Sequence, residues 1–409
     1  MRIGIGLNLL APDNGGVTNY TLTLLRNWAA HAPEHPMVLF SFAHNEPLLS
    51  TLPPEARRHE IRLQTQEEAL LHFDKIDVYF CPFGTLWPRP VRKPAVLTFH
   101  DMQERFYPEF FTDKEMEERF FHYDWSLRMA DAVITISDFT REMVSRLVGI
   151  RRSACHVVHH VPDELPEPVR PEVWDPEARR RPFLFYPANL WRHKNHGRLL
   201  RALALAISQG LEVDLVCTGS LLGRDSDWDR SVRALGLEHR VHHLGKVSRA
   251  EISWLFRNAQ SLFFPSLFEG FGIPLLEAMQ SGCPIACGRN TSQPEVAQES
   301  ALYFDAHRVE SIAAALLRIS CDEPLRERLV VAGLERIQAF TIENQIKGHL
   351  DAFAAACHRH TRSRQWWNEK VRLPHSHRMR RLLTDREKQT AAALLRERTQ
   401  VPVHFESVP

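Results

Sequence analysis

The stretch of the chain that decides the fold reads Phe268-Glu269-Gly270-Phe271-Gly272-Ile273-Pro274-Leu275-Leu276-Glu277. It follows a short apolar run that ends near Pro265 and has the unbroken hydrophobicity of a buried strand. Pro274 suits the first turn of a helix, and Gly282 suits the end of that helix. The stretch therefore predicts a strand, a glycine-rich loop and a helix, which is the repeating unit of a parallel sheet flanked by helices.

Two glutamates bracket the glycine-rich loop and are the first candidate binding residues. Glu269 precedes the predicted helix, and Glu277 lies one turn inside it, eight residues later. Gly270 and Gly272 allow backbone N–H groups to point at an anion, and ionised carboxylates accept hydrogen bonds from sugar hydroxyls. At this spacing the two carboxylates would serve two different rings of one ligand. The alternative is that either glutamate is only a helix-end charge that interacts with the helix dipole.

Strand-like apolar runs alternate with helix-period segments along most of the chain, which predicts a parallel sheet in each half. The strand candidates are 2–7, 37–42, 76–81, 95–99 and 132–136, followed by 182–187, 213–218, 241–244, 261–265 and 284–287. A chain of 409 residues exceeds the roughly 250–300 residues at which one core stops growing. The sequence therefore predicts the α/β class, with two Rossmann-like, doubly wound domains that face an interdomain cleft.

A proline-rich segment marks the boundary between the two domains. Six prolines lie between Val161 and Pro182, a density that excludes regular structure and suits a stiff connector. The predicted parts are an N-terminal domain over 1–165, a linker over 166–182, a C-terminal domain over 183–340, a crossover helix over 341–357 and a basic tail over 358–409. The tail contains Trp366 and Trp367.

Composition and charge exclude several classes of protein. With 44% hydrophobic and 25% charged residues, the chain is an ordinary globular protein. No run approaches the ~20 apolar residues of a membrane span and no signal-peptide core follows Met1, so we expect a cytoplasmic protein. Residues 357–409 hold 12 basic and 5 acidic side chains, which leaves 39 and 45 for the rest. A body at −6 argues against nucleic-acid binding, whereas the tail is either a solvated helix or a contact for phosphates or an anionic membrane.

Further candidates follow other predicted strands, where ligands bind in open α/β sheets. Gly15 and Gly16 let the backbone approach a phosphate at a helix N-terminus, although a plain tight turn explains them equally well. His100 ends a predicted strand. Its ring N–H could donate to a sugar hydroxyl or a developing charge, whereas a histidine there is otherwise structural. Ser137 or Asp138 is interpreted as an N-cap.

Two clusters that look like metal sites are interpreted otherwise, and no metal is expected. The carboxylates of Asp225, Asp227 and Asp229 could bridge a divalent cation to a diphosphate, but they lie before a helix, where Asp227 or Asp229 suits an N-cap. Seven cysteines without a C-x-x-C pair are interpreted as structural, buried side chains in a reducing compartment. The histidines of strand-like stretches lack metal-ligand spacing; they are His156, His159, His160, His242 and His243.

The segment from Glu269 to Glu277 resembles the E-x7-E signature of the retaining family-4 glycosyltransferases of the GT-B fold, and the resemblance covers most of the chain. In that family the first glutamate, matching Glu269, contacts the donor sugar, and the second, matching Glu277, holds the nucleotide ribose. The amides around Phe271 and Gly272 face the sugar and the diphosphate. The family also has a histidine near the donor sugar at the place of His100.

The second domain resembles the family in its other loops as well. In the run Tyr186-Pro187-Ala188-Asn189-Leu190-Trp191-Arg192-His193-Lys194-Asn195, Lys194 matches a lysine that clamps the diphosphate, although a surface lysine is the alternative. Asn189 stands where the family commonly has an arginine, and Arg192 is a candidate to supply the missing charge. Gly219 and Val247 lie in the loops that wrap the nucleotide base in the family.

The resemblance implies a retaining, metal-independent hexosyltransferase that needs no cofactor. It moves a sugar from a nucleotide-sugar donor to a hydroxyl of a glycan or lipid-linked glycan, and the departing phosphate oxygen takes the acceptor proton. The catalytic residues that it implies are His100, Lys194 and Glu269. The donor-binding residues that it implies are Gly15, Gly16, Asn189, Arg192, Lys194, Gly219, Val247, Glu269, Gly270, Phe271, Gly272 and Glu277.

The runs around His100 and Lys194 look most like bacterial enzymes of O-antigen or exopolysaccharide synthesis, which often use GDP-mannose. We therefore expect a mannosyltransferase of lipopolysaccharide or related polysaccharide synthesis, with the tail 358–409 in peripheral contact with the cytoplasmic face of the inner membrane. UDP, ADP and dTDP donors stay open. The alternatives are a nucleotide-sugar 2-epimerase of similar architecture and a catalytically idle nucleotide-sugar-binding partner subunit, which the asparagine at position 189 keeps open.

Overall fold

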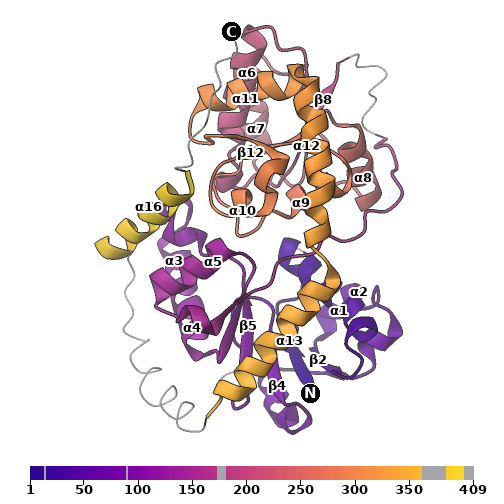
Figure 1. Ribbon diagram of the computed structural model, residues 1–409, viewed down its shortest axis with the longest axis vertical. Coiled ribbons are helices and arrows are strands. Elements are labelled where there is room, and N and C mark those ends of the chain that lie inside the picture. The colour runs from indigo at the N-terminus through magenta and orange to yellow at the C-terminus, as the bar shows by residue number, and fades with distance from the viewer. Residues whose placement is uncertain (13–14, 89–90, 173–180, 362–383, 400–409) are drawn as a thin grey trace. The chain divides into compact units, whose positions relative to one another are not determined.

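The computed structural model describes residues 1–12, 15–88, 91–172, 181–361 and 384–399 (Figure 1). It divides into two compact units. The N-terminal unit comprises Met1–Asp163 and Phe340–Ala391, and the C-terminal unit comprises Glu164–Ala339 and Ala392–Pro409. Within the described ranges, no helix is long and apolar enough to cross a membrane.

The N-terminal unit is built on a seven-stranded parallel sheet of order β3-β2-β1-β4-β5-β6-β7. The apolar runs form its inner strands because both faces of a parallel sheet are buried. The order reverses between β1 and β4, which is the switch point of a Rossmann fold. The strands are β1 (Ile3–Gly6), β2 (Met37–Ser41), β3 (Glu60–Arg62), β4 (Val78–Cys81), β5 (Ala95–Phe99), β6 (Ala132–Thr135) and β7 (Cys155–Val157).

Helical segments connect most of these strands, as is usual for parallel crossovers, whereas the described residues between β4 and β5 contain no helix. Ser137 caps the N-terminus of α5, because its hydroxyl accepts a hydrogen bond from the Thr140 amide at 3.0 Å, which confirms the predicted N-cap. The helices are α1 (Gly15–His31), α2 (Glu46–Leu49), α3 (Asp113–Arg119), α4 (Trp125–Met129) and α5 (Asp138–Met143), and a 3-10 turn, η5 (Gln103–Arg105), follows β5.

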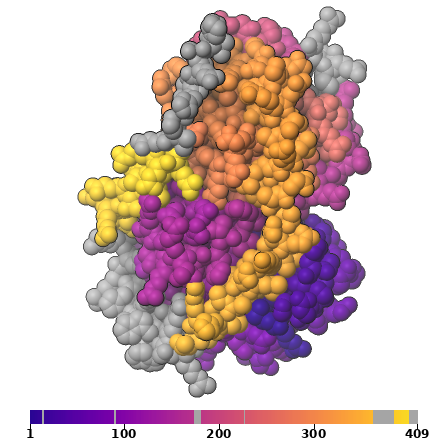
Figure 2. Space-filling model, in the orientation of Figure 1, coloured from indigo at the N-terminus to yellow at the C-terminus, as the bar shows by residue number. Residues whose placement is uncertain are grey.

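The helix α13 (Ile342–Arg359) packs into the N-terminal unit although it follows the second half of the chain. Its apolar positions predicted a helix over 341–357, and the structure starts it one residue later because the Thr341 side chain caps it. Ile346 and Phe353 join the core cluster that contains Phe80 of β4. The opposite side of α13 lies on the surface, as the orange band of Figure 2 shows. This helix therefore completes the core of the first unit.

The C-terminal unit has a six-stranded parallel sheet of order β10-β9-β8-β11-β12-β13. When the strands are numbered within each unit, this is the order 3-2-1-4-5-6, which the first six strands of the N-terminal sheet also have. Its strands are β8 (Phe183–Pro187), β9 (Asp214–Thr218), β10 (Val241–His243), β11 (Ser261–Phe264), β12 (Ile285–Gly288) and β13 (Ala301–Phe304). Its helices are α6 (His196–Ser208), α7 (Asp225–Ala234), α8 (Arg249–Asn258), α9 (Ile273–Gln280), α10 (Gln293–Ala297), α11 (Val309–Cys321) and α12 (Glu323–Arg336).

The structure contains all ten predicted strands, with ends that differ by one or two residues, and it corrects other expectations. The short strands β3, β7 and β13 were not predicted, because edge strands carry polar residues or few residues. The prediction of Asp227 or Asp229 as an N-cap is wrong: α7 begins at Asp225 with Arg224 before it, so both aspartates lie inside the helix. Cys321 is exposed, unlike the buried cysteines expected.

Part of the predicted basic tail is helical. The helix α16 (Asp385–Thr399) has Ala391 and Leu394 buried, whereas residues 362–383, with Trp366 and Trp367, and residues 400–409 lie outside the described ranges. Glu387 of α16 forms an ion pair of 2.8 Å with Arg105 of η5. This helix is therefore attached to the N-terminal unit by a specific contact.

Candidate functional site

The loop between β11 and α9 carries the residues of the E-x7-E segment. Gly272 precedes α9 with φ +104°, where a Cβ atom would lie 3.1 Å from the Leu275 side chain. Only glycine adopts this left-handed backbone without strain, which explains its place in the loop. Pro274 has no N–H, and the Leu275 amide donates to the Gly272 carbonyl at 2.9 Å, so the start of α9 favours an anion chiefly through the helix dipole.

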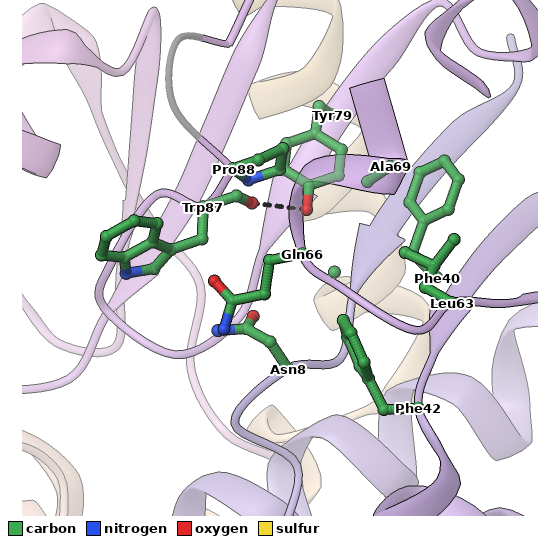
Figure 3. A pocket seen from close by; sticks show the side chains of 10 residues that line it. Asn8, Phe40, Phe42, Leu63, Gln66, Ala69, Tyr79, Trp87 and Pro88 are labelled. Atoms are coloured by element: carbon green, nitrogen blue, oxygen red, sulfur yellow. Dashed lines mark hydrogen bonds between the residues drawn. The ribbon is translucent and has the colours of Figure 1, made fainter. Parts of the chain in front are cut away.

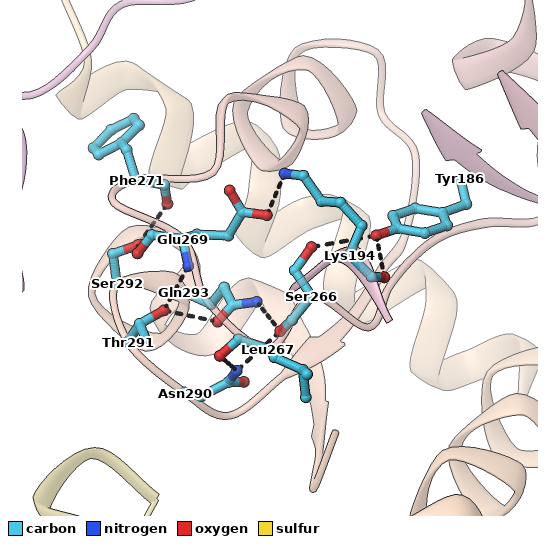
Figure 4. A network of polar contacts seen from close by, with 10 residues as sticks. All are labelled: Tyr186, Lys194, Ser266, Leu267, Glu269, Phe271, Asn290, Thr291, Ser292 and Gln293. Atoms are coloured by element: carbon cyan, nitrogen blue, oxygen red, sulfur yellow. Dashed lines mark hydrogen bonds and ion pairs between the residues drawn. The ribbon is translucent and has the colours of Figure 1, made fainter. Parts of the chain in front are cut away.

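The backbone of this loop is held by polar side chains of the loop between β12 and α10 (Figure 4). The Ser292 hydroxyl lies 3.0 Å from the carbonyl oxygen of Glu269 and 2.9 Å from that of Phe271. The Thr291 hydroxyl accepts a hydrogen bond of 3.1 Å from the Glu269 amide. Sequence reasoning missed Thr291 and Ser292. Their only signal is a polar run directly after the strand predicted at 284–287.

Lys194 and Glu269, predicted from separate segments, form one ion pair. The Lys194 Nζ atom lies 2.6 Å from Glu269 Oε1, and the two side chains are 17% and 12% exposed. Lys194 ends a short 3-10 turn, η10 (Arg192–Lys194), that follows β8, and its backbone carbonyl accepts a hydrogen bond of 2.7 Å from the Tyr186 hydroxyl (Figure 4). The ammonium group has three N–H donors, so it can hold the carboxylate and a phosphate oxygen together.

Glu277 has a cationic partner that sequence reasoning did not find. Its side chain is 9% exposed, and its Oε1 atom lies 2.5 Å from Arg249 Nη1. Arg249 is the first residue of α8, after the N-cap Ser248, and its side chain is 40% exposed. Each glutamate of the E-x7-E segment is thus paired with one cation from another segment of the C-terminal unit.

The predicted Asn189 has a structural role in the loop after β8. Its Oδ1 atom accepts a hydrogen bond of 2.7 Å from the Ser220 amide in the loop after β9. Gly219 has φ +117°, and a Cβ atom there would lie 2.8 Å from the backbone of Ala188. Arg192 is exposed at the start of η10. The loop after β8 therefore carries Lys194 as its half-buried cation, and position 189 brings no charge.

The loop after β10 borders an open pocket of about 320 Å³ in the C-terminal unit. Val247, predicted to contact the donor, lines it together with Lys246 and Arg170. The Gly245 carbonyl accepts a hydrogen bond of 2.8 Å from the Gly219 amide. The loops after β8, β9 and β10 therefore form one connected surface at the carboxyl edge of this sheet.

In the N-terminal unit, Gly15 and Gly16 are the first residues of α1, so their amides lie at a helix N-terminus. His100 follows β5, and its Nε2 atom lies 2.7 Å from the carbonyl oxygen of Pro82. Because a carbonyl only accepts, Nε2 carries the proton, and desolvation lowers the pKa of His100, which keeps the ring neutral. The expected ring N–H donor is thus already used, and the correction is that Nδ1 can act only as an acceptor.

Buried rings pack beside His100. The Tyr20 hydroxyl lies 2.6 Å from His349 Nε2 and 2.8 Å from the Thr98 hydroxyl, and the His160 ring stacks on His100 at 5.9 Å. Burial lowers the pKa of His349 to about 4, so this ring is neutral. Its Nδ1 atom donates to the Gln345 carbonyl at 2.7 Å, so its Nε2 atom accepts from Tyr20. The helix α13 thereby supports α1 and the end of β5.

Among the described residues, no group of three or more His, Cys, Asp or Glu side chains could hold a metal ion. Asp225, Asp227 and Asp229 are exposed along α7.

Comparisons with known proteins agree with this architecture. A model described as "Glycosyltransferase Family 4" matches residues 14–164, and one described as "Glycosyl transferases group 1" matches residues 174–336. The O-antigen chain mannosyltransferase B of Escherichia coli is 28% identical over 63% of this chain and 70% of its own length. The O-antigen chain mannosyltransferase RfbU of Salmonella typhimurium is 25% identical over 56% of this chain and 62% of its own length.

Solved structures share the fold at low identity. Sucrose-phosphate synthase from Thermosynechococcus elongatus superimposes with a TM-score of 0.69 at 19% identity, over 87% of this chain and 98% of its own. HepE of Anabaena, solved in complex with UDP and glucose, gives a TM-score of 0.66 at 18% identity, over 86% of this chain and 100% of its own. With both family domains on two Rossmann-like units, the chain belongs to the family-4 glycosyltransferases of the GT-B fold.

Proposed function

We propose that this protein transfers mannose from GDP-mannose to a hydroxyl of a glycan or lipid-linked glycan during synthesis of a cell-surface polysaccharide, with retention at the anomeric carbon. The observation that carries the proposal is the half-buried ion pair between Lys194 of η10 and Glu269 of the glycine-rich loop before α9. The mannose donor is supported by the names of the Escherichia coli and Salmonella relatives.

In the proposed reaction, the C-terminal unit stabilises the leaving group. Loss of the sugar leaves a diphosphate of growing negative charge, so donors fixed in advance at the phosphates supply much of the rate. Lys194 and the amides of Gly270 to Gly272 are these donors, and the dipole of α9 adds to them. Glu269 holds hydroxyls of the sugar, and Glu277, released from Arg249, holds the ribose.

The N-terminal unit supplies the acceptor side of the proposed reaction. His100 accepts a hydrogen bond from a sugar hydroxyl at Nδ1, because its Nε2–H donates to Pro82. The amides of Gly15 and Gly16 lie at the N-terminus of α1, where an anionic group of the substrates would be favoured. The departing phosphate oxygen takes the acceptor proton, and the proposal contains no step that uses a metal or a cofactor.

A thermal-shift screen tests the donor. The ligands are GDP-mannose, UDP-glucose, UDP-N-acetylglucosamine, dTDP-rhamnose and their bare nucleotides, since a ligand at 100 times its Kd adds about 2.7 kcal/mol of stability. We expect GDP and GDP-mannose to stabilise the protein and the variant Glu277→Gln to lose that shift. Glu327→Gln, on the exposed side of α12, is the matched control. If only another nucleotide series stabilised the protein, the donor would be the sugar of that nucleotide and not GDP-mannose.

The variant Lys194→Ala tests catalysis. Removal of one fixed donor to a developing oxyanion should lower turnover by on the order of 10²–10³. Lys347→Ala, an exposed lysine of α13, should turn over like the wild type. Activity of Lys194→Ala above half of wild type would remove Lys194 from the site. Donor consumption without any acceptor would indicate the 2-epimerase, and donor binding without turnover would indicate the idle subunit.

The proposal also places the protein in the cytoplasm, with residues 358–409 in peripheral contact with the inner membrane. The support is the excess of basic side chains in residues 357–409, which hold 12 basic against 5 acidic groups. Each Lys or Arg near an anionic surface contributes about 1 kcal/mol of attraction. A lipid-linked acceptor would bring the enzyme to that surface.

A further inference from the structure

A small pocket lies at the carboxyl edge of the N-terminal sheet, where β1, β2 and β4 end (Figure 3). Its free volume is about 10 Å³, which is the room of about one water molecule and so close to that of a methyl group. The described residues that line it are Gly6, Asn8, Phe40, Phe42, Leu63, Gln66, Ala69, Tyr79, Trp87 and Pro88.

The floor of the pocket is apolar. Phe40, Leu63 and Ala69 are buried there, with 1%, 3% and 2% of their surface exposed. The buried Tyr79 hydroxyl donates a hydrogen bond of 2.6 Å to the Trp87 carbonyl, so it is already satisfied (Figure 3). Apart from the Tyr79 hydroxyl oxygen, whose proton is committed to Trp87, the floor side chains of Phe40, Leu63 and Ala69 offer a polar group no partner, whereas an apolar group of one carbon would fit.

The mouth of the pocket is polar on one side. Asn8 and Gln66 are half-buried, and their carboxamides lie side by side in Figure 3. Neither side chain hydrogen-bonds to any other residue that the structure describes. Each carboxamide offers two N–H donors and one carbonyl acceptor. A bound group that carries both a donor and an acceptor can therefore be held at the mouth.

One loop joins the pocket to His100. The loop begins at Pro82, whose carbonyl accepts the His100 Nε2–H at 2.7 Å, and it ends at Trp87 and Pro88, which line the pocket. Pro82 and Trp87 are five residues apart, so their Cα atoms lie within about 18 Å of each other. A short glycan that places one sugar in the pocket can therefore place another sugar beside His100, which is proposed to bind at the reacting centre.

An acetamido group matches both parts of this pocket. Its apolar end is a methyl group, and the amide next to that methyl group carries one N–H donor and one carbonyl acceptor. A hydroxymethyl group would instead place its hydroxyl against the apolar floor, where an unpaired hydroxyl costs free energy. We propose that the pocket binds the 2-acetamido group of an N-acetylhexosamine in the acceptor, with its methyl group against Ala69 and its amide against Asn8 and Gln66. This inference rests on the proposed transfer to a glycan.

Saturation-transfer NMR on the full chain tests the inference without any need for turnover. The probes are methyl 2-acetamido-2-deoxyglucoside and methyl glucoside, which differ only at the second carbon. We expect strong saturation of the acetyl methyl group, and binding of the acetamido sugar that is about tenfold tighter than that of its partner, as one small apolar group in a fitted pocket provides. Equal binding of the two sugars, or binding of neither, would overturn the inference.

Two variants address the two parts of the pocket. Gln66→Ala removes one carboxamide, and Ala69→Val fills the floor. Each should abolish the tenfold preference, while Gln64→Ala, an exposed glutamine two residues from Gln66, should keep it. An unchanged preference in both pocket variants contradicts the proposed contacts. The donor-induced thermal shift is measured on the same samples, so a failed acceptor pocket is distinguished from a failed glycosyltransferase.

Discussion

At the scale of single residues, the candidate site consists of charges that are paired in advance. The Lys194 Nζ atom pairs with Glu269 Oε1 at 2.6 Å, and the Arg249 Nη1 atom pairs with Glu277 Oε1 at 2.5 Å. A partly buried carboxylate without a cation would have no partner to offset its desolvation, so these pairs hold both glutamates in place. A nucleotide-sugar would then exchange one set of partners for another, with diphosphate and hydroxyls in place of side chains.

A residue outside the site makes stability depend on pH. Glu104 in η5 is 1% exposed, and burial raises its pKa from 4.5 to about 7, against the opposing effect of Arg105 and Arg119. Between pH 4.5 and about 7, Glu104 keeps a proton in the folded protein that it has lost in the unfolded chain. The free energy of unfolding is therefore highest below this range and falls as the pH rises through it. The loss from pH 4.5 to 7 is on the order of 3 kcal/mol.

The variant Glu104→Gln should therefore remove much of this decline, because its amide does not titrate. Thermal unfolding between pH 5 and pH 8 measures the slope for each protein. Glu118→Gln on α3, with a side chain that is 58% exposed, should keep the wild-type slope. The same slope in Glu104→Gln and in the wild type would show that another group is responsible.

At the scale of elements, the loops at the carboxyl edge of the C-terminal sheet support one another. The loop after β8 and the loop after β9 approach so closely that a side chain at Gly219 would meet the Ala188 backbone at 2.8 Å. The Asn189 side chain joins them with a hydrogen bond of 2.7 Å to the Ser220 amide. The position of Lys194 thus depends on a loop that comes from the next strand.

Gly219→Ala should destabilise the protein, because it combines φ +117° with this backbone contact. Each such strain costs about 1–3 kcal/mol, and a shifted loop should also weaken donor binding. The matched control is Gly197→Ala in α6, where nothing lies within 4 Å of the new Cβ atom. That change should stabilise by up to about 1 kcal/mol, since alanine favours a helix. Thermal unfolding measures the stability of both variants. Equal transition temperatures would contradict the close approach of Gly219 to the Ala188 backbone.

At the scale of the whole molecule, charge is divided unevenly along the chain. Residues 357–409 carry 12 basic and 5 acidic groups, whereas the rest carries 39 and 45. The helix α16 within this tail is held to η5 by the pair of Glu387 and Arg105 at 2.8 Å, so the tail does not act as a free extension along its whole length. The remaining basic residues of the tail lie mostly in 362–383, outside the described ranges.

The triple variant Arg378→Glu, Arg380→Glu and Arg381→Glu should weaken binding to anionic vesicles. Each lost cation near the surface removes about 1 kcal/mol, and the new acidic groups add repulsion. Flotation with phosphatidylglycerol vesicles should carry the wild type and leave the variant behind, while neutral phosphatidylcholine vesicles should carry neither. Equal partitioning of the two proteins would reduce the tail to a solvated extension. The variant leaves α16 and its contact with Arg105 in place.

The sequence by itself determined the two-domain α/β architecture and the E-x7-E segment. Apolar runs that alternate with helical periods report which residues are buried on both faces of a parallel sheet, and this pattern is local. It missed β3, β7 and β13 because short edge strands carry little of that pattern. His100 was predicted because it directly follows a strand, and Lys194 and Glu269 were predicted because they match motifs of the family that the sequence resembles.

The tertiary structure alone decided how these residues are used. Arg249 meets Glu277 across 28 residues, and Ser292 holds the Glu269 carbonyl across 23. The proton of His100 is committed to Pro82. Asn8, after β1, lies beside Gln66, after β3, because β2 pairs with both of these strands. Such contacts depend on strand order and loop conformation, which bring distant segments to one edge of a sheet. No local pattern in the chain encodes a distance between residues that far apart.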